Sequence, residues 1–142
     1  MRTVFVHGSG RVGVDAWPRQ AGWDDARFVV RPGFGAGESG TVTDSEPEAQ
    51  LVNEACGADG AHVIASSYGA LAAWGAAALR GTSVRSLALL EPAVFSLGRG
   101  GFAVEAHIRA VDPVMRRAPD LSAGEFIVAL YTAFGWTSQG AR

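Results

Sequence analysis

The sequence predicts an α/β fold, in which helices flank a parallel β-sheet of about four strands. Short apolar runs rich in β-branched residues recur along the first two thirds of the chain. Segments with helical signals alternate with these runs, and glycine or proline separates the two kinds of segment. Such alternation implies right-handed crossovers and parallel strands, with helices on both faces of the sheet.

Four runs have the pattern of strands. The first is continuously apolar rather than alternating, which suits a strand covered on both faces, as in a parallel sheet. The first ends at Gly8, the second at Pro32, and the fourth at Pro92. The expected strands cover 3–7, 27–30, 61–66 and 86–90.

The segments between these strands carry helix signals. A loop and a first helix of uncertain length are expected within 12–25, where Pro18 fits a helix start better than a helix interior. Ser45 and Glu48 form the S-x-x-E pattern of a capping box, which predicts a helix to about residue 56. A third helix is expected from about 68 to 80, closed by Gly81.

The C-terminal part of the chain has a different character. Gly98 to Gly101 form a flexible joint, and only helical signals follow. Ser122 and Glu125 form a second capping box. An apolar stripe then repeats at i, i+4 and i+8 in Phe126, Leu130 and Phe134. We therefore predict two parts, a core over 1–97 and a helical lid or cap segment over 98–142.

Composition excludes several classes of protein. The chain has 142 residues, 48% hydrophobic and 18% charged, which is enough for a single globular core. Its net charge of −2 and its lack of a Lys/Arg cluster argue against nucleic acid or an anionic membrane as a partner. The single cysteine, Cys56, allows no intramolecular disulfide and no zinc-type spacing, and no metal is expected.

The sequence also bears on localisation. A strand pattern begins within a few residues of the N-terminus, without the basic head and apolar stretch of a signal peptide. No apolar run approaches the ~20 residues that a membrane span needs. We expect a cytoplasmic protein.

The most informative motif surrounds Ser67. Ala65, Ser67 and Gly69 give the pattern small-x-Ser-x-Gly between an apolar strand and an Ala-rich helix. This is the pattern of a nucleophile elbow, a turn so sharp that only small flanking residues fit, which lifts the serine hydroxyl clear of the sheet. Ser66 supplies a neighbouring hydroxyl, but the spacing to Gly69 selects Ser67. A serine needs a base within hydrogen-bond reach to become a nucleophile at neutral pH.

Three further motifs accompany the elbow in a fixed order: His7-Gly8-Ser9-Gly10, Pro32-Gly33-Phe34-Gly35 and Leu89-Leu90-Glu91-Pro92. Together they resemble the α/β-hydrolase superfamily, in particular its small single-domain esterase-like members with a helical lid. The resemblance spans about Thr3 to Pro92. The chain departs from the family pattern at three sites: Ala65 replaces the first elbow glycine, Ser66 replaces a frequent histidine, and Arg31 and Pro32 occupy a stretch where aspartate is common.

The resemblance implies a chemistry and a set of residues. Ser67 would be the nucleophile, and the backbone N–H of Tyr68 would be one oxyanion-hole donor. The N–H of Ser9 would be the second donor, with Gly10 as the next candidate, and His7 is interpreted as a positioning residue. The implied reaction is hydrolysis of a small carboxylic ester or related acyl compound, with no cofactor.

The resemblance also implies that two catalytic groups are missing. In this family the acid and the histidine usually follow later strands, in the order Ser, acid, His. The remaining acid or base candidates are Glu91, at the carboxyl end of the fourth strand, and His107, in the expected lid. We therefore expect a truncated chain that is weakly active or inactive.

Two other functions stay open. Gly8, Gly10 and Gly13 match G-x-G-x-x-G after a strand, the fingerprint of a dinucleotide-binding module, and Arg31 suggests a 2′-phosphate and hence NADP. Pro18 would break the helix that this module requires. Alternatively, the chain is a non-catalytic hydrolase remnant that acts as an interaction partner, with an unpaired sheet edge that leads to self-association.

Overall fold

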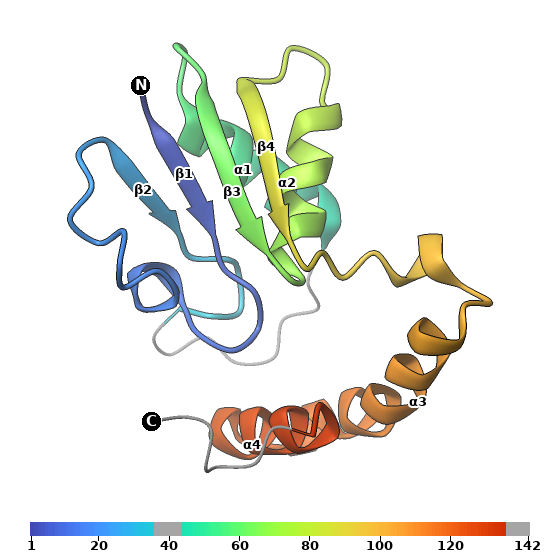
Figure 1. Cartoon of the computed structure of the whole chain (residues 1–142). Helices are drawn as coiled ribbons and strands as arrows, with labels where there is room; N and C mark the ends of the chain where they lie inside the picture. Colours follow the sequence, from blue (N-terminus) through green and yellow to red (C-terminus); the bar gives the residue numbers. More distant parts are fainter. Residues whose placement is uncertain (36–43, 136–142) are drawn as a thin grey trace. The chain divides into compact units, whose positions relative to one another are not determined.

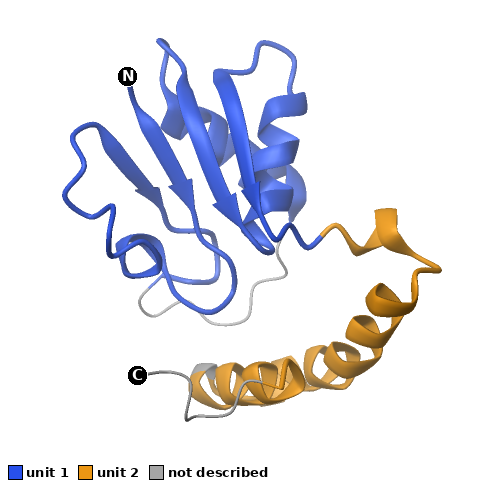
Figure 2. Cartoon of the chain, viewed as in Figure 1, with its two compact units in different colours: residues 1–93 blue, residues 94–142 orange. Residues whose placement is uncertain are grey.

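A computed structural model describes residues 1–35 and 44–135 of the chain (Figure 1). The chain divides into two compact units, Met1–Ala93 and Val94–Arg142 (Figure 2). Each unit is described by itself.

The first unit is built on a four-stranded sheet in which every pairing is parallel. The strand order is β2-β1-β3-β4. This confirms the predicted α/β architecture, and the strands lie close to their expected ranges: β1 Thr3–Val6, β2 Ala26–Val29, β3 Ala61–Ser66 and β4 Val84–Leu90.

Two helices of the first unit cover one face of the sheet. Helix α1 (Ser45–Cys56) connects β2 to β3, and α2 (Gly69–Ala78) connects β3 to β4. Figure 1 shows both helices on the same side. The core lies between them and the sheet, where the buried side chains are mainly valines and alanines: Val4, Val6, Val29, Ala49, Val52, Val63, Ala65, Ala70, Ala73 and Ala76.

The prediction of helices on both faces is therefore wrong for the described part of this unit, because its α-helices cover one face only. The strand order explains the difference. The crossovers through α1 and α2 both run toward β4, and right-handed crossovers in one direction place their helices on one face. Only the β1–β2 connection runs the opposite way, and there the structure has a single short 3₁₀ helix, η1 (Gly13–Ala16).

The prediction of a helix within 12–25 is therefore wrong, except for the single turn of η1. Aromatic side chains near this connection pack against β1 and its neighbour. The ring of Phe5 lies 5.1 Å from that of Trp17, 5.6 Å from that of Trp23 and 5.3 Å from that of Phe28, measured between centroids. This packing sets the path of the segment, which continues through turns around Pro18.

The start of α1 differs from the prediction by one residue. The N-cap is Asp44, whose side chain accepts a hydrogen bond from the backbone N–H of Glu46 at 3.2 Å. The capping box predicted at Ser45 and Glu48 is wrong, because Glu48 is buried and its carboxylate binds Arg31 instead.

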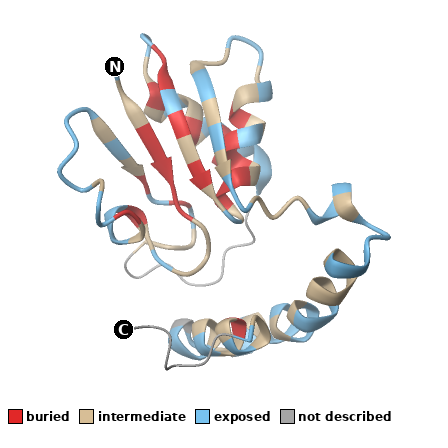
Figure 3. Ribbon diagram, viewed as in Figure 1, coloured by how far each residue is buried: buried red, intermediate tan, exposed pale blue. Residues whose placement is uncertain are grey.

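The second unit is helical. It contains η2 (Phe95–Gly98), α3 (Phe102–Arg117), η3 (Ala118–Asp120) and α4 (Ala123–Ala133). The capping box at Ser122 and Glu125 is confirmed, with both reciprocal hydrogen bonds present. Most of the described residues of the second unit are exposed or half-buried, and Leu130 of the apolar stripe is buried (Figure 3). Among the described helices, none combines the length and apolar character needed to cross a lipid bilayer.

Candidate functional site

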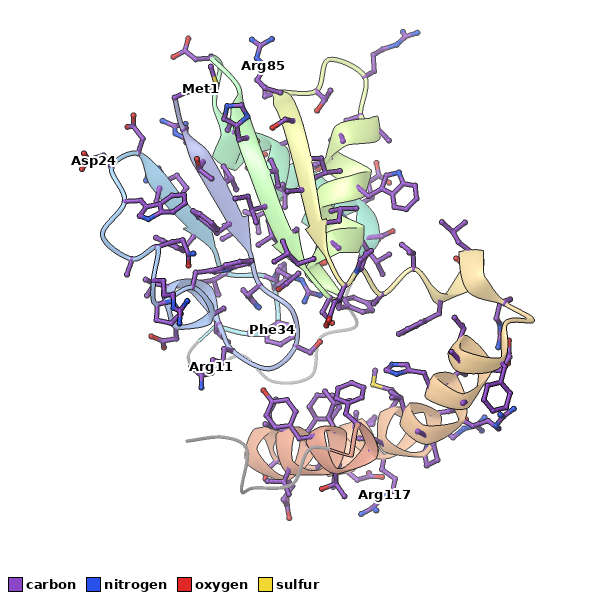
Figure 4. The ribbon with its side chains drawn as sticks, viewed as in Figure 1. Met1, Arg11, Asp24, Phe34, Arg85 and Arg117 are labelled. Carbon is purple, nitrogen blue, oxygen red and sulfur yellow. The ribbon has the colours of Figure 1, made fainter. Side chains whose placement is uncertain are left out.

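The strand order places the site at one end of the sheet. The chain leaves β1 toward one edge and β3 toward the other, so the carboxyl ends of these two neighbours form a topological switch point, with Val6 paired to Ala65. Open α/β sheets bind ligands at such a point. Phe34 lies at this end of the sheet, and Met1 and Arg85 lie at the other (Figure 4).

The turn after β3 has the geometry of an elbow. Ser67 has a φ of +50°, in the left-handed region, and its residue is exposed. Its backbone is held on both sides, because its N–H donates to the carbonyl of Leu90 at 2.9 Å and its carbonyl accepts from the N–H of Ala93 at 3.1 Å. A non-glycine residue in this region costs about 1–3 kcal/mol and persists only where its surroundings impose it.

Two glycines bring the β1 loop against this elbow. A Cβ on Gly8 would lie 2.9 Å from the Cβ of Ser67, and a Cβ on Gly69 would overlap the carbonyl oxygen of His7. The segment that follows Gly8 therefore begins in contact with the serine. Within the described part of the chain, no hydrogen bond occupies the backbone N–H of Ser9.

A buried polar network lies next to the elbow. It consists of three buried polar residues, whose exposed fractions are 0% for His7, 1% for Arg31 and 3% for Glu48. The N–H of Arg31 donates to Nε2 of His7 at 3.1 Å, so Nε2 must be unprotonated. Nδ1 then carries the proton and donates to the carbonyl of Gly8 at 2.6 Å. With both ring nitrogens engaged, His7 is unsuited to act as the base for Ser67.

Burial lowers the pKa of His7 below its ordinary value of 6.5, and the bond to the Gly8 carbonyl offsets part of this effect. The unfolded chain therefore binds this proton at a higher pH than the folded protein. The free energy of unfolding should fall as the pH drops below about 6.5, by at most about 1.4 kcal/mol per pH unit from this group. Urea unfolding between pH 7 and 5 measures the effect.

His7→Asn is the matched variant for this measurement, because an amide can still donate to the Gly8 carbonyl but does not titrate. Its stability should vary less with pH than that of the wild type. Identical pH profiles would contradict a neutral, buried His7.

The other acid and base candidates lie in different surroundings. Glu91 follows β4 directly, is exposed and has a φ of +46°. His107 belongs to the second unit, where its ring lies 4.8 Å from that of Phe95 and 5.1 Å from that of Phe134. His62 is near the amino end of β3, at the opposite end of the strand from Ser67, and its Nδ1 is 2.6 Å from the hydroxyl of Ser86.

The surroundings of Gly13 and Arg31 bear on the dinucleotide interpretation. That interpretation needs a helix N-terminus after the glycine run to bind phosphate. Residues 13–16 form only the short η1, and the guanidinium of Arg31 is paired with Glu48 inside the protein. The described residues also contain no group of three His, Cys, Asp or Glu side chains that could hold a metal ion.

The strained elbow predicts a stability gain on substitution. Ser67→Gly should raise the free energy of unfolding by about 1 kcal/mol, because glycine adopts the left-handed region without the penalty of a Cβ. Ser67→Ala keeps the Cβ and should leave the stability almost unchanged. Thermal unfolding of both variants checks this, and a Ser67→Gly protein less stable than Ser67→Ala would show that the turn is not strained.

No family model matches the chain, and the comparison with curated proteins finds no match.

Proposed function

We propose that this chain is a serine hydrolase-like protein of the α/β-hydrolase type, in which Ser67 attacks the carbonyl carbon of a small carboxylic ester. The observation that carries the proposal is the conformation of Ser67, an exposed serine at positive φ on a two-residue turn at the switch point of a parallel sheet. A strained, exposed serine at this position is what nucleophilic attack requires.

The backbone around the serine supports an oxyanion site. The N–H of Tyr68 immediately precedes α2, where the helix dipole favours negative charge. The N–H of Ser9 supplies the second donor from the loop after β1, with Gly10 as the next candidate. One such donor lowers the barrier by roughly 3–4 kcal/mol when it meets the charge that develops on the carbonyl oxygen.

The proposal includes slow turnover. Attack by Ser67 needs a group that accepts its proton. Within the described first unit, His7 is fully engaged and His62 lies at the far end of its strand. Neither histidine of this described unit is placed to act as the base, so we expect weak or no hydrolysis of p-nitrophenyl esters.

A fluorophosphonate probe tests the proposal, because its adduct with serine is irreversible, so that even slow attack by Ser67 accumulates as a covalent product during a long incubation. Mass spectrometry should locate the adduct on Ser67. Labelling should disappear in Ser67→Ala and persist in Ser66→Ala, the matched variant that removes the adjacent hydroxyl. Labelling of Ser66, or no more labelling of the folded protein than of the urea-unfolded chain, would refute the proposal. If Ser67-dependent ester hydrolysis is fast, His107→Ala shows whether His107 is the base.

A second candidate function is favoured by the edge of the sheet at β4. In the described part of the chain, β4 pairs with β3 alone. It is the longest strand, and Arg85 is its one charged residue. Residues Ser86, Ala88 and Leu90 are exposed. Long edges with few charges pair readily with other chains, so we propose self-association through β4, which needs no catalysis.

This proposal predicts an apparent mass that rises with protein concentration in light scattering. Ala88→Lys should reduce the rise, because a charged side chain on an edge strand opposes pairing. Ala78→Lys, on the exposed end of α2, adds the same charge elsewhere and should not. A constant monomer mass at high concentration would contradict association through this edge.

A further inference from the structure

The side chain of Arg31 makes several hydrogen bonds next to the elbow. It is 1% exposed, although it follows an edge strand. Nε and Nη2 each donate to a carboxylate oxygen of Glu48 at 3.1 Å, in a bidentate pair. Nη1 donates to the carbonyl oxygen of Gly8 at 3.3 Å. All three guanidinium nitrogens are therefore engaged.

The guanidinium also lies between two aromatic rings. Its central carbon is 4.9 Å from the ring centroid of Phe34 and 4.9 Å from that of Tyr68. Tyr68 is the residue after the candidate nucleophile. One cation thus contacts both segments that carry the proposed oxyanion donors, the loop after β1 and the start of α2.

The contact with Gly8 has a geometric consequence. The Gly8 carbonyl accepts from both Nη1 of Arg31 and Nδ1 of His7, so its direction is fixed from one side. The peptide bond to Ser9 is trans, as are all those described. In a trans peptide the N–H points opposite to the carbonyl, so the N–H of Ser9 is directed away from the buried network.

Stability alone does not explain this arrangement. A buried ion pair is often no more stabilising than apolar residues of similar volume, because both charges must be desolvated. The bidentate pair with Glu48 uses Nε and Nη2 of the guanidinium, so Nη1 remains to donate to the Gly8 carbonyl. Lysine, a point charge on a flexible stem, cannot hold a carboxylate in the same bidentate fork while donating to the carbonyl.

We propose that Arg31 is a positioning residue that orients the oxyanion donor of Ser9, with Glu48 holding its guanidinium in place. This inference rests on the proposed function of Ser67. Arg31 acts through the Gly8 peptide and touches no reacting atom. Its effect should therefore be seen in the reactivity of Ser67 and in the Ser9 amide.

Two variants separate positioning from folding. Arg31→Met combined with Glu48→Leu removes both charges together, so that neither is left buried without its partner. Arg31→Lys keeps the charge and loses the planar fork. Circular dichroism establishes that each variant is folded. Two quantities are then compared with the wild type: the rate of fluorophosphonate labelling at Ser67, and the amide proton shift of Ser9 when the adduct forms.

The labelling rate should fall by about tenfold or more in both variants, since a single misdirected donor costs this much or more. The downfield shift of the Ser9 amide, which reports its hydrogen bond to the phosphoryl oxygen, should be present in the wild type and lost in both variants. If folded variants label as fast as the wild type with the same Ser9 shift, Arg31 is only structural and the proposed function stands. If the wild type itself is not labelled at Ser67, the proposed function fails and this inference fails with it.

Discussion

Replacing Glu48 with alanine is expected to lower the free energy of unfolding by about 3–5 kcal/mol. The substitution leaves the guanidinium of Arg31 buried without its carboxylate, and Arg31 is only 1% exposed. A typical domain is stable by about 5–15 kcal/mol, so the loss would remove a large fraction of the total. Urea unfolding followed by circular dichroism measures it.

The control for this experiment removes both charges. Arg31→Met combined with Glu48→Leu should recover most of the stability, because no charge remains in the buried site. The double variant should then be clearly more stable than Glu48→Ala alone. A Glu48→Ala protein within about 1 kcal/mol of the wild type would mean that the guanidinium finds solvent or another partner, and would contradict the buried network.

Replacing Gly69 with alanine is expected to destabilise the first unit at or beyond the upper end of the roughly 1–3 kcal/mol typical of overpacking. The added methyl group would overlap the carbonyl oxygen of His7 and lie 2.9 Å from its carbonyl carbon. Both atoms belong to the backbone, so no side-chain rotation relieves the clash. The loop after β1 would have to move away from the elbow, and labelling of Ser67 should fall as well.

Gly124→Ala is the matched control, since Gly124 also lies in the first turn of a helix but nothing approaches within 4 Å of an added Cβ. There alanine should raise the helix stability by roughly 0.5–1 kcal/mol. Urea unfolding and fluorophosphonate labelling of the two variants together give the comparison. If Gly69→Ala unfolds like the wild type, the close approach of the loop to the elbow is wrong.

Features encoded by neighbouring residues could be predicted from the sequence. The strands lie in short segments rich in apolar residues that end near a turn residue, and the sequence predicts β3 at its observed range of 61–66. The elbow follows from small residues around Ser67, because only a sharp turn needs them. The capping box at Ser122 and Glu125 depends on two residues three positions apart, and it too was found.

Features that depend on distant residues were missed. Arg31 and Glu48 are 17 positions apart, and no local pattern indicates that they pair with each other. Glu48 fits a capping pattern with Ser45, but its carboxylate binds the buried guanidinium of Arg31 instead. The turns around Pro18 follow from aromatic packing against Phe5, and no local periodicity reveals such packing.

The hydrogen bonds of the elbow backbone couple it to whatever follows β4. The carbonyl of Ser67 is tied to the N–H of Ala93, and the next residue, Val94, begins the second unit. The N–H of Ser67 is tied to the carbonyl of Leu90 in the same way. The left-handed conformation of this serine is therefore maintained by the chain on both sides of Glu91, and not by the turn alone.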